Sequence, residues 1–454
     1  MKHRLLGAAV AGCALAAIGA GPVHALSDQL WIGVPYETVL PGPDTDGSTR
    51  ERTLEVRITH DNLDNDVPAG RLSVDASEIA SFAVVSWPAN CLPETPTKAV
   101  CDVPAMPAGM EGVPAALIGL RALPDADLSA SGTVRYTATA GELSAADTET
   151  RITVGNGPDL GLSQAPWQRG LTPGTDHTVR ATVANNGNRA VERTLLWVYS
   201  SYGLRFKERH ANCEYREGAT GTGALCVLDE AVAPGQRYDL VTRLGIGRNA
   251  LYERFDHSVL PYSDAALEEA RGDYTWTRGA GPELDLLPVT GQRAAADEDD
   301  VDLSDNYRAV VLDAKNSADL KLTGNRMRGA AGDTVTARMT VLNRGPAWVA
   351  SLGAGSPVAV VRFQAPAGTS VVGLPEDCWT QPPSEEGPSE ATYFCGTPIY
   401  LHDKASYTFK VQLRIDKVIR GARAVVETIR DSELPVERFD PNLRNNVSAI
   451  VVNG

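Results

Sequence analysis

The stretch Gly332 to Gly345, GDTVTARMTVLNRG, decides the fold, because the chain carries the same pattern once more, 158 positions earlier. The earlier copy is Gly174 to Gly187, GTDHTVRATVANNG. Both begin with a glycine, alternate small or apolar residues with polar ones, and end in Asn-x-Gly. Alternation with a period of two is typical of a strand with one buried face, and Asn-x-Gly is typical of a turn that closes it. The sequence therefore predicts one strand and turn around which each domain is built.

The length and composition of the chain are those of an ordinary globular protein with several domains. Its 454 residues correspond to about three domains of roughly 150 residues each. Hydrophobic residues make up 43% and charged residues 22% of the chain. The 42 glycines and 29 prolines suit a fold with many turns. Together with the alternating pattern, these values predict an all-β protein.

The N-terminus is typical of an exported protein. Residues 2–4 are basic, Leu5 to Ala20 is apolar, and residues 23–25, Val-His-Ala, form a small-residue cleavage site. We therefore expect residues 1–25 to be a cleaved signal peptide and the mature protein to be secreted to the extracellular side.

A lipid anchor is the alternative to free secretion. The run Val10-Ala11-Gly12-Cys13 is similar to a bacterial lipobox, which would leave the protein as a lipoprotein anchored through Cys13. After the signal peptide no stretch of 18 apolar residues follows, so we expect no transmembrane segment in the mature chain.

The charge of the chain excludes one class of partners. The 42 basic and 57 acidic residues give a net charge of −15, and loss of Lys2 and Arg4 with the signal peptide makes it more negative. Binding to nucleic acid or to anionic lipid requires basic patches. We therefore expect no nucleic acid among the partners.

Strand-like segments divide the mature chain into three domains. The first spans residues 26–155, the second 156–317 and the third 318–454. The second domain contains an insert near 249–300, in which Asp264 to Ala270 has the composition of a short helix. In the first domain the organising strand has a weaker form, in which apolar residues alternate up to the triplet His60-Asp61-Asn62.

The cysteines follow the same division. Without Cys13, six remain, an even number in a compartment where disulfides persist. Six cysteines allow fifteen connectivities. Because each domain contains two of them at the same place in the order of strands, the repeat favours sequential pairing, Cys91–Cys101, Cys213–Cys226 and Cys378–Cys395.

These motifs resemble a known group of domains. The second and third domains open with Asp159-Leu160 and Asp319-Leu320, continue through Asn-x-Gly and a cysteine pair, and close with an Asp- and Asn-rich turn and a strand. This order resembles the cell-adhesion-related (CARDB-like) and conserved-repeat Ig-like domains of secreted bacterial proteins, and the Ala- and Arg-rich composition is similar to actinobacterial versions. The resemblance implies three tandem Ig-like β-sandwich domains used as spacer, adhesive or scaffold. It covers the first domain only loosely.

Two candidate binding sites lie in the insert of the second domain. The aromatic residues Tyr252, Phe255, Tyr274 and Trp276 would suit sugar stacking if they formed an exposed platform, although such residues also pack inserts onto their own domain. Asp302, Asp305 and Asn306 follow an acidic run and are the candidate Ca²⁺ ligands. The alternative is a solvated acidic linker without any cofactor.

Two short motifs in the insert resemble functional signals. Arg271-Gly272-Asp273 is the RGD tripeptide of adhesion proteins, and Leu287 to Gly291, LPVTG, fits the pattern cut by sortases. The first can arise by chance, because Arg, Gly and Asp are common in this chain. The second lacks the apolar span and basic tail of a sorting signal, so we expect neither to act.

No catalytic motif appears in the sequence: there is no G-x-S-x-G, no H-E-x-x-H and no Gly-rich phosphate loop. We therefore expect a non-catalytic extracellular interaction, adhesion or scaffold protein, whose partner is an extracellular protein or a cell-wall glycan. A glycan- or Ca²⁺-binding module is the first alternative. A secreted hydrolase with two converging acids is the second.

Overall fold

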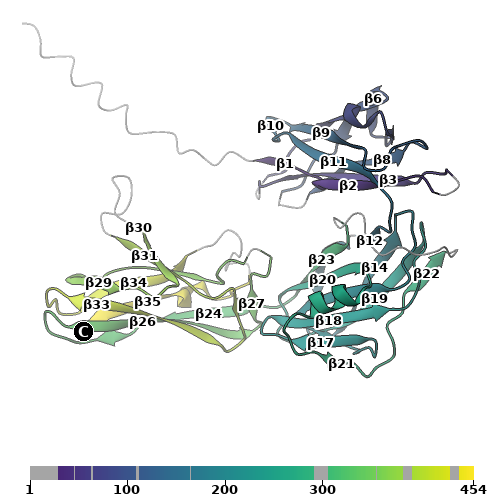
Figure 1. The fold of residues 1–454 in the computed structure, drawn as a ribbon. Coiled ribbons are helices and arrows are strands. Elements are labelled where there is room, and N and C mark those ends of the chain that lie inside the picture. The colour runs from purple at the N-terminus through teal and green to yellow at the C-terminus, as the bar shows by residue number, and fades with distance from the viewer. Residues whose placement is uncertain are drawn as a thin grey trace, which may run out of the picture. The chain divides into compact units, whose positions relative to one another are not determined.

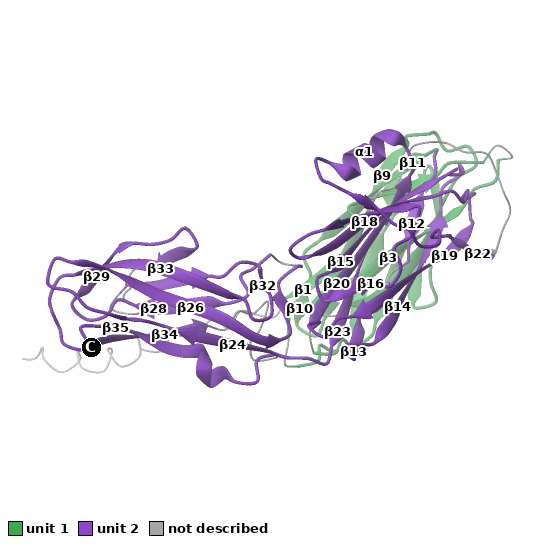
Figure 2. Cartoon of the chain, turned by 90° about the horizontal axis from the view of Figure 1, so that it is seen from below, with its two compact units in different colours: residues 1–156 green, residues 157–454 purple. Residues whose placement is uncertain are grey.

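The computed structural model describes residues 29–454 except 45–46, 63–64, 109–111, 164, 291–304, 354, 382–390 and 430–438. The expected signal peptide, with Cys13, lies outside the described residues. The chain divides into two compact units, residues 1–156 and 157–454 (Figure 2). Each unit is built almost entirely of strands (Figure 1).

Unit 1 is one β-sandwich with its own core. Its first sheet has the order β1 (Leu30–Gly33), β3 (Glu51–His60), β8 (Val113–Ala122), β5 (Ala83–Ser86). Its second sheet has the order β2 (Glu37–Pro41), β11 (Thr148–Gly155), β9 (Ser131–Ala140), β4 (Gly70–Asp75), β7 (Lys98–Val103), β6 (Cys91–Thr95), and β10 (Leu143–Ser144) pairs with β9.

Unit 2 contains two more sandwiches, and the second sandwich of the chain comes first in it. One sheet has the order β12 (Leu160–Leu162), β14 (Asp176–Asn185), β19 (Arg237–Ile246), β16 (Leu204–Phe206), and β22 (Leu287–Thr290) pairs with β19. The other has the order β13 (Gln168–Leu171), β23 (Tyr307–Ala314), β20 (Tyr252–Pro261), β15 (Thr194–Ser201), β18 (Gly221–Leu228), β17 (Cys213–Glu217), β21 (Thr277–Arg278).

The third sandwich again has a separate core. One sheet has the order β24 (Ala318–Thr323), β26 (Thr334–Pro346), β33 (Ser406–Ile415), β29 (Thr369–Gly373). The other has the order β25 (Arg326–Met327), β35 (Val447–Val452), β34 (Ala422–Ile429), β28 (Val360–Gln364), β31 (Thr392–Gly396), β30 (Cys378–Gln381). The short strands β27 (Val349–Ala350) and β32 (Tyr400–Leu401) pair beside them.

The three sandwiches share one topology. In each sandwich, the first and third strands belong to a sheet of four strands along its main path. The second strand belongs to the other sheet, where it runs parallel to the last strand of the sandwich: β2 with β11, β13 with β23, β25 with β35. Two packed sheets with this division of strands are the Ig-like sandwich. The first sandwich follows the pattern in full, although its sequence resemblance is loose.

A disulfide crosses the same hairpin in every sandwich. The bonded pairs are Cys91–Cys101 between β6 and β7, Cys213–Cys226 between β17 and β18, and Cys378–Cys395 between β30 and β31. In each case the two cysteines are direct register partners across antiparallel strands. The pairing is the sequential one that the repeat predicts.

Removing one of these disulfides should cost a measurable share of stability. Because the Cys213–Cys226 bond closes a loop with a sequence separation of 13, replacing both residues by alanine should lower the free energy of unfolding of the second sandwich by about 3 kcal/mol. Chemical denaturation followed by circular dichroism would measure the loss, with the Cys91→Ala/Cys101→Ala protein as the matched control in the other unit. A change under about 1 kcal/mol would contradict the constraint expected from a loop of this length.

A buried polar side chain occupies the same position near the end of one strand in each sandwich. Asn185 of β14 and Asn343 of β26 are fully buried and lie opposite Leu160 and Leu320 in register. His60 of β3 occupies the same register position, opposite Leu30, and is also fully buried.

Each of these side chains binds the backbone two residues further on. Asn185 Oδ1 accepts from the backbone N–H of Gly187 at 3.0 Å, and Asn343 Oδ1 accepts from that of Gly345 at 2.8 Å. In the first sandwich His60 Nδ1 accepts from the backbone N–H of Asn62 at 3.2 Å. Buried polar groups must be satisfied in this way, so the Asn-x-Gly motif is a buried hydrogen-bonding element.

The predicted turn at Asn-x-Gly is confirmed for β14, which ends at Asn185, and is wrong for β26. β26 continues through Asn343 to Pro346, and the strand that follows β14 in the chain belongs to the other sheet. The asparagine ties the end of its strand to the crossing segments: Asn185 Nδ2 donates to Arg189 O at 2.7 Å and to Val232 O at 2.9 Å.

The predicted insert of the second domain begins too early. Residues 252–261 are β20, a central strand that pairs with both β15 and β23. The insert is therefore the segment between β20 and β23, and it includes α1 (Asp264–Arg271), β21 and β22. The short helix lies where the composition predicts it, and Ser263 caps it by accepting from the backbone N–H of Ala266 at 3.1 Å.

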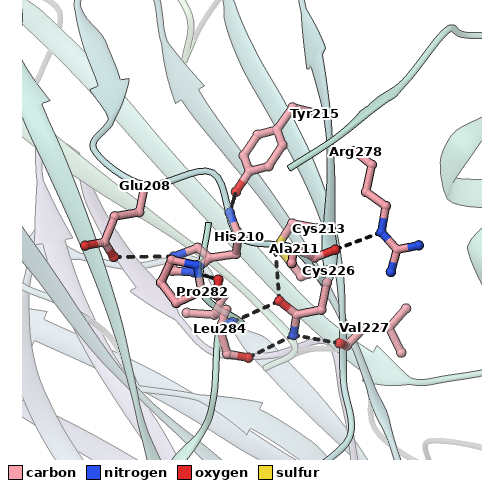
Figure 3. The surroundings of a disulfide bond; sticks show 11 residues. Glu208, His210, Ala211, Cys213, Tyr215, Cys226, Val227, Arg278, Pro282 and Leu284 are labelled. Carbon is pink, nitrogen blue, oxygen red and sulfur yellow. Dashed lines mark hydrogen bonds and ion pairs between the residues drawn. A yellow bond between two sulfur atoms is a disulfide. The ribbon is translucent and has the colours of Figure 1, made fainter. Parts of the chain in front are cut away.

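The return path of the insert is fixed beside the disulfide of the second sandwich (Figure 3). Arg278 Nε donates to Ala211 O at 2.8 Å, and a ring nitrogen of His210 lies 2.9 Å from Pro282 O. Asn212 exchanges hydrogen bonds with the backbone of Leu284 at 2.9 and 3.0 Å. These contacts hold the segment 278–284 against the loop that precedes Cys213.

Within unit 2, the segment between the second and third sandwiches is hydrogen-bonded to both. Asn316 Nδ2 donates to Arg248 O at 2.9 Å and to Ala250 O at 2.8 Å. Ser317 O in turn accepts from the backbone N–H of Ala347 at 3.0 Å. The joint is therefore built from specific contacts on both sides.

The centre of this joint is a buried tryptophan of the third sandwich. Trp348 is 1% exposed, and its backbone N–H donates to Asn249 O at 3.0 Å. Its ring centroid lies 5.3 Å from that of Tyr202 and 5.9 Å from that of His402. His402 stacks on Tyr202 at 4.2 Å, and its Nε2 lies 2.8 Å from Ala219 O. Aromatic rings from both sandwiches thus form one cluster.

A buried carboxylate completes the joint. Glu253 of β20 is 2% exposed and accepts from Trp348 Nε1 at 2.7 Å and from the backbone N–H groups of Gly203 and Leu251 at 3.0 Å. It also accepts from the Ser201 hydroxyl. Burial raises the pKa of Glu253, and these hydrogen bonds oppose that rise. Three donors come from the second sandwich and one from the third.

Candidate functional site: the outer face of the second sandwich

The second sandwich carries an aromatic surface on the sheet that contains β15, β17, β18 and β20. Along β15 the side chains of Leu196 and Val198 belong to the buried core. Successive residues of a strand point to opposite faces, so Trp197 and Tyr199 lie on the outer face, where both are half-buried. Their rings are nearly parallel, with an interplanar angle of 8° and centroids 6.4 Å apart.

The insert adds further aromatic rings and a cation to this face. The Arg216 guanidinium of β17 lies 3.7 Å from the ring centroid of Tyr274 and 5.7 Å from that of Trp276. Such a contact between a cation and a ring stabilises both by about 0.5–1 kcal/mol when exposed. Tyr274 is 62% exposed. We call Trp197, Tyr199, Arg216, Tyr274 and Trp276 the outer aromatic face.

The register places these groups close together. Gly223 of β18 pairs with Tyr199 on one side and with Arg216 on the other. A Cβ atom at Gly223 would lie 3.6 Å from Cη2 of Trp276, so the indole covers this glycine.

The insert is held over the sheet by an ion pair at the end of α1. Arg271 donates through Nε and Nη2 to the two carboxylate oxygens of Glu214 on β17, at 2.8 and 2.7 Å. Its carbonyl oxygen accepts from Trp276 Nε1 at 3.0 Å. Bidentate pairing of this kind fixes both position and orientation. In the RGD tripeptide the Arg271 guanidinium is therefore bound to Glu214, and the Arg271 carbonyl is bound to the Trp276 indole.

Charged groups border the outer aromatic face on β20 and β23. Arg254 Nε lies 2.7 and 2.8 Å from the two carboxylate oxygens of Asp256, and its Nη2 donates to the Tyr307 hydroxyl. Asp256 pairs with Tyr199 in register. Burial raises the pKa of Asp256, while its pair with Arg254 acts in the opposite direction. Burial likewise raises the pKa of Tyr199.

The four aromatic residues of the predicted platform lie in different parts of the structure. Tyr274 and Trp276 belong to the outer aromatic face. Phe255 does not, because it is 2% exposed and part of the core of the second sandwich. Tyr252 packs against the core of the third sandwich. An exposed platform of all four residues is therefore wrong, since two of them point into cores.

Sequence reasoning missed Trp197, Tyr199 and Arg216. The two aromatic residues are separated by one position in a predicted strand, a spacing that places them on one face. The neighbours of Trp197 in the strand are also apolar, so its sequence context does not distinguish it from a core residue.

Two of the three candidate Ca²⁺ ligands, Asp305 and Asn306, lie within the described residues. Asp302 lies outside the described residues. Asn306 is buried, and its Nδ2 donates to Val259 O at 2.7 Å, while Asp305 O accepts from the backbone N–H of Leu162 at 3.0 Å. Among the described residues no group of three or more His, Cys, Asp or Glu side chains is arranged to hold a metal ion.

Most of the sortase-like motif lies in a strand. Its first four residues, Leu287–Thr290, form β22, which pairs with β19 through Pro288 and Tyr238. Gly291 lies outside the described residues. The motif thus forms an additional strand of the second sandwich.

The strand orders and disulfides define a protein of tandem Ig-like β-sandwiches. No protein-family model matches the chain, and no curated protein sequence matches it. In the part of the chain that the structure describes, no helix is long and apolar enough to cross a membrane.

Several solved structures show weak similarity to the chain. The Escherichia coli adhesin FdeC is 12% identical and covers 96% of this chain and 99% of its own, with a TM-score of 0.19. Titin domains I67–I69 are 6% identical over 94% of this chain and 99% of theirs, with a TM-score of 0.18. A putative membrane-anchored protein from Corynebacterium diphtheriae is 10% identical over 94% of this chain and 91% of its own, with a TM-score of 0.17. These values are too low for any functional argument.

Proposed function

We propose that this protein is a secreted, non-catalytic interaction protein that binds an extracellular partner through the outer aromatic face. The observation that supports the proposal is the set of rings gathered there from β15 and from the insert, with Arg216 of β17 against the rings of the insert. Aromatic and arginine side chains dominate the energetics of binding surfaces. The three disulfides support an oxidising, extracellular setting.

A cell-wall glycan is the partner class that the ring geometry favours. The nearly parallel rings of Trp197 and Tyr199 and the exposed ring of Tyr274 offer flat apolar surfaces of the kind on which a sugar ring stacks. An extracellular protein is the other partner class that fits this surface. A hydrolase remains the remote alternative, and it would show as release of reducing ends from the same polysaccharides.

The double substitution Tyr274→Ala/Trp276→Ala should reduce binding at least tenfold, because it removes both rings that contact Arg216. The measurement is a binding screen of the mature protein against insoluble cell-wall polymers and common polysaccharides, with and without Ca²⁺. The matched control is Trp379→Ala, which removes a 49% exposed tryptophan from the third sandwich. Equal binding by the double variant and the parent protein would sink the proposed surface.

The place of action needs a separate measurement. Mass spectrometry of the exported protein should find Leu26 at the N-terminus if the signal peptide is cleaved as proposed. A lipid-modified Cys13 would instead identify the anchored form, and a chain that retains residues 1–25 in the cytoplasm would contradict export.

A further inference from the structure

A second surface of unit 2, separate from the outer aromatic face, has the features of a ligand site. A groove of about 790 Å³ lies where the second and third sandwiches meet. Its walls include Tyr202, Arg205 and Arg248 of the second sandwich and Asp403 and Lys404 of the third. Ligand sites occur preferentially at the interfaces between domains.

The charge of the groove contrasts with that of the chain. Four basic residues line it, Arg205, Lys207, Arg248 and Lys404, and all four are exposed. Lys207 forms an ion pair with Asp176 at 2.8 Å, which leaves three cations against Asp403. In a protein of net charge −15 this is a local reversal of sign. A groove of one sign concentrates counter-ions of the other.

The backbone at Lys404 adds an independent observation. Lys404 has φ of 63° within the turn His402–Ala405, which is closed by a hydrogen bond from Ala405 N to His402 O at 3.2 Å. This left-handed conformation favours glycine and strains a residue with a Cβ atom. Strained residues that a fold retains are often functional. We therefore expect Lys404 to be retained in this turn for its ammonium group, which lines the groove.

The remaining walls suit a saccharide. Tyr202 is 39% exposed, with its ring stacked on His402, and Phe206 also belongs to the lining. Thr175 and Asn249 add polar side chains. Ring surfaces with a few polar groups and several cations match an acidic sugar polymer, because the rings contact the sugar and the cations bind its anionic groups.

We propose that this groove binds an anionic oligosaccharide, with Arg205, Arg248 and Lys404 as the cations that recognise its carboxylate, sulfate or phosphate groups. The site bridges both sandwiches and uses none of the residues of the outer aromatic face. An experiment that contradicts this site would therefore leave the proposed function intact, and the reverse also holds.

Isothermal titration calorimetry on the mature protein at low ionic strength tests the site. The probes are a galacturonate hexamer, a heparin hexasaccharide and a poly(glycerol phosphate) oligomer, which separate carboxylate, sulfate and phosphodiester recognition. Maltohexaose is the neutral control. We expect at least one anionic probe to bind and to lose affinity as NaCl is raised. If none binds at millimolar concentration, or if maltohexaose binds as tightly, the proposal is wrong.

Lys404→Gly separates binding from folding. It removes the cation and relieves the positive φ, so the melting temperature should stay or rise while the affinity for the anionic probe falls at least tenfold. Arg205→Gln should give a similar loss, and Lys321→Gln, an exposed lysine of β24 outside the groove, should change nothing. The Tyr274→Ala/Trp276→Ala protein should bind the probe normally. Wild-type affinity in both Lys404→Gly and Arg205→Gln would overturn the site.

Discussion

Replacing Asn343 by leucine should lower the free energy of unfolding of the third sandwich by about 3–5 kcal/mol. The side chain is 0% exposed and makes three hydrogen bonds, donating to Ala347 O at 2.8 Å and Leu401 O at 3.1 Å and accepting from Gly345 N at 2.8 Å. Leucine is of similar size but leaves all three backbone groups buried without this partner. Each such group costs about 1–3 kcal/mol, so the lost hydrogen bonds outweigh the gain in apolar surface.

Chemical denaturation combined with hydrogen exchange measured by mass spectrometry would locate the effect. Amides of β26 and β33 should exchange faster in Asn343→Leu, while those of unit 1 should not change. The informative control is Asn343→His, because His60 fills the same register position in the first sandwich and binds the backbone two residues ahead. Histidine should therefore lose less stability than leucine. Equal stability of the leucine variant and the parent would contradict the role given to Asn343.

The sequence predicted the strands well where one face of a strand packs on a core and the other meets solvent. Residues 133–140 and 238–246 alternate visibly, and β9 and β19 include them. β20 was missed because the pattern of its sequence, YERFDHSVLP, is broken: Glu253, Asp256 and His257 are all buried. Glu253 and Asp256 are buried against specific partners. Charged residues of this kind interrupt the alternation, so the sequence pattern predicts a loop.

The role of the Asn-x-Gly motif had the same difficulty. Its spacing was correct, but a turn and a buried hydrogen-bonding asparagine have the same sequence. Only the register shows that Asn185, Asn343 and His60 are equivalent. The equivalence of a histidine with two asparagines depends on geometry at the ring nitrogen, which composition does not reveal.

The candidate surfaces depended even more on tertiary structure. The strand TLLWVYSS, residues 194–201, is apolar at consecutive positions, so its sequence does not indicate that Trp197 and Tyr199 face outward. The groove at the joint combines residues from positions 174–176, 202–249, 346 and 403–404, which no local pattern connects. Disulfide pairing was more accessible, because each pair is local and recurs with the repeat.

Replacing Trp348 by alanine should uncouple the second and third sandwiches at a cost of about 3–5 kcal/mol. The indole is 1% exposed and is the one donor to Glu253 that comes from the third sandwich. Glu253 keeps its donors from Ser201, Gly203 and Leu251. The second sandwich should therefore remain folded, and the loss should fall on the joint.

Hydrogen exchange at the backbone N–H groups of residues 347 and 348, which donate to Ser317 O and Asn249 O, should report this loss directly. Small-angle scattering should show a broader distribution of distances within the chain, because the two sandwiches no longer share a packed tryptophan. Trp348→Phe is the control: it keeps an aromatic ring against Tyr202 and His402 but removes the N–H that Glu253 accepts. Its cost should be smaller, about 1.5–3 kcal/mol, the range for a hydrogen bond to a charged group. If alanine leaves exchange at the joint unchanged, the indole does not couple the sandwiches, and the contacts of Asn316, His402 and the backbone do so without it.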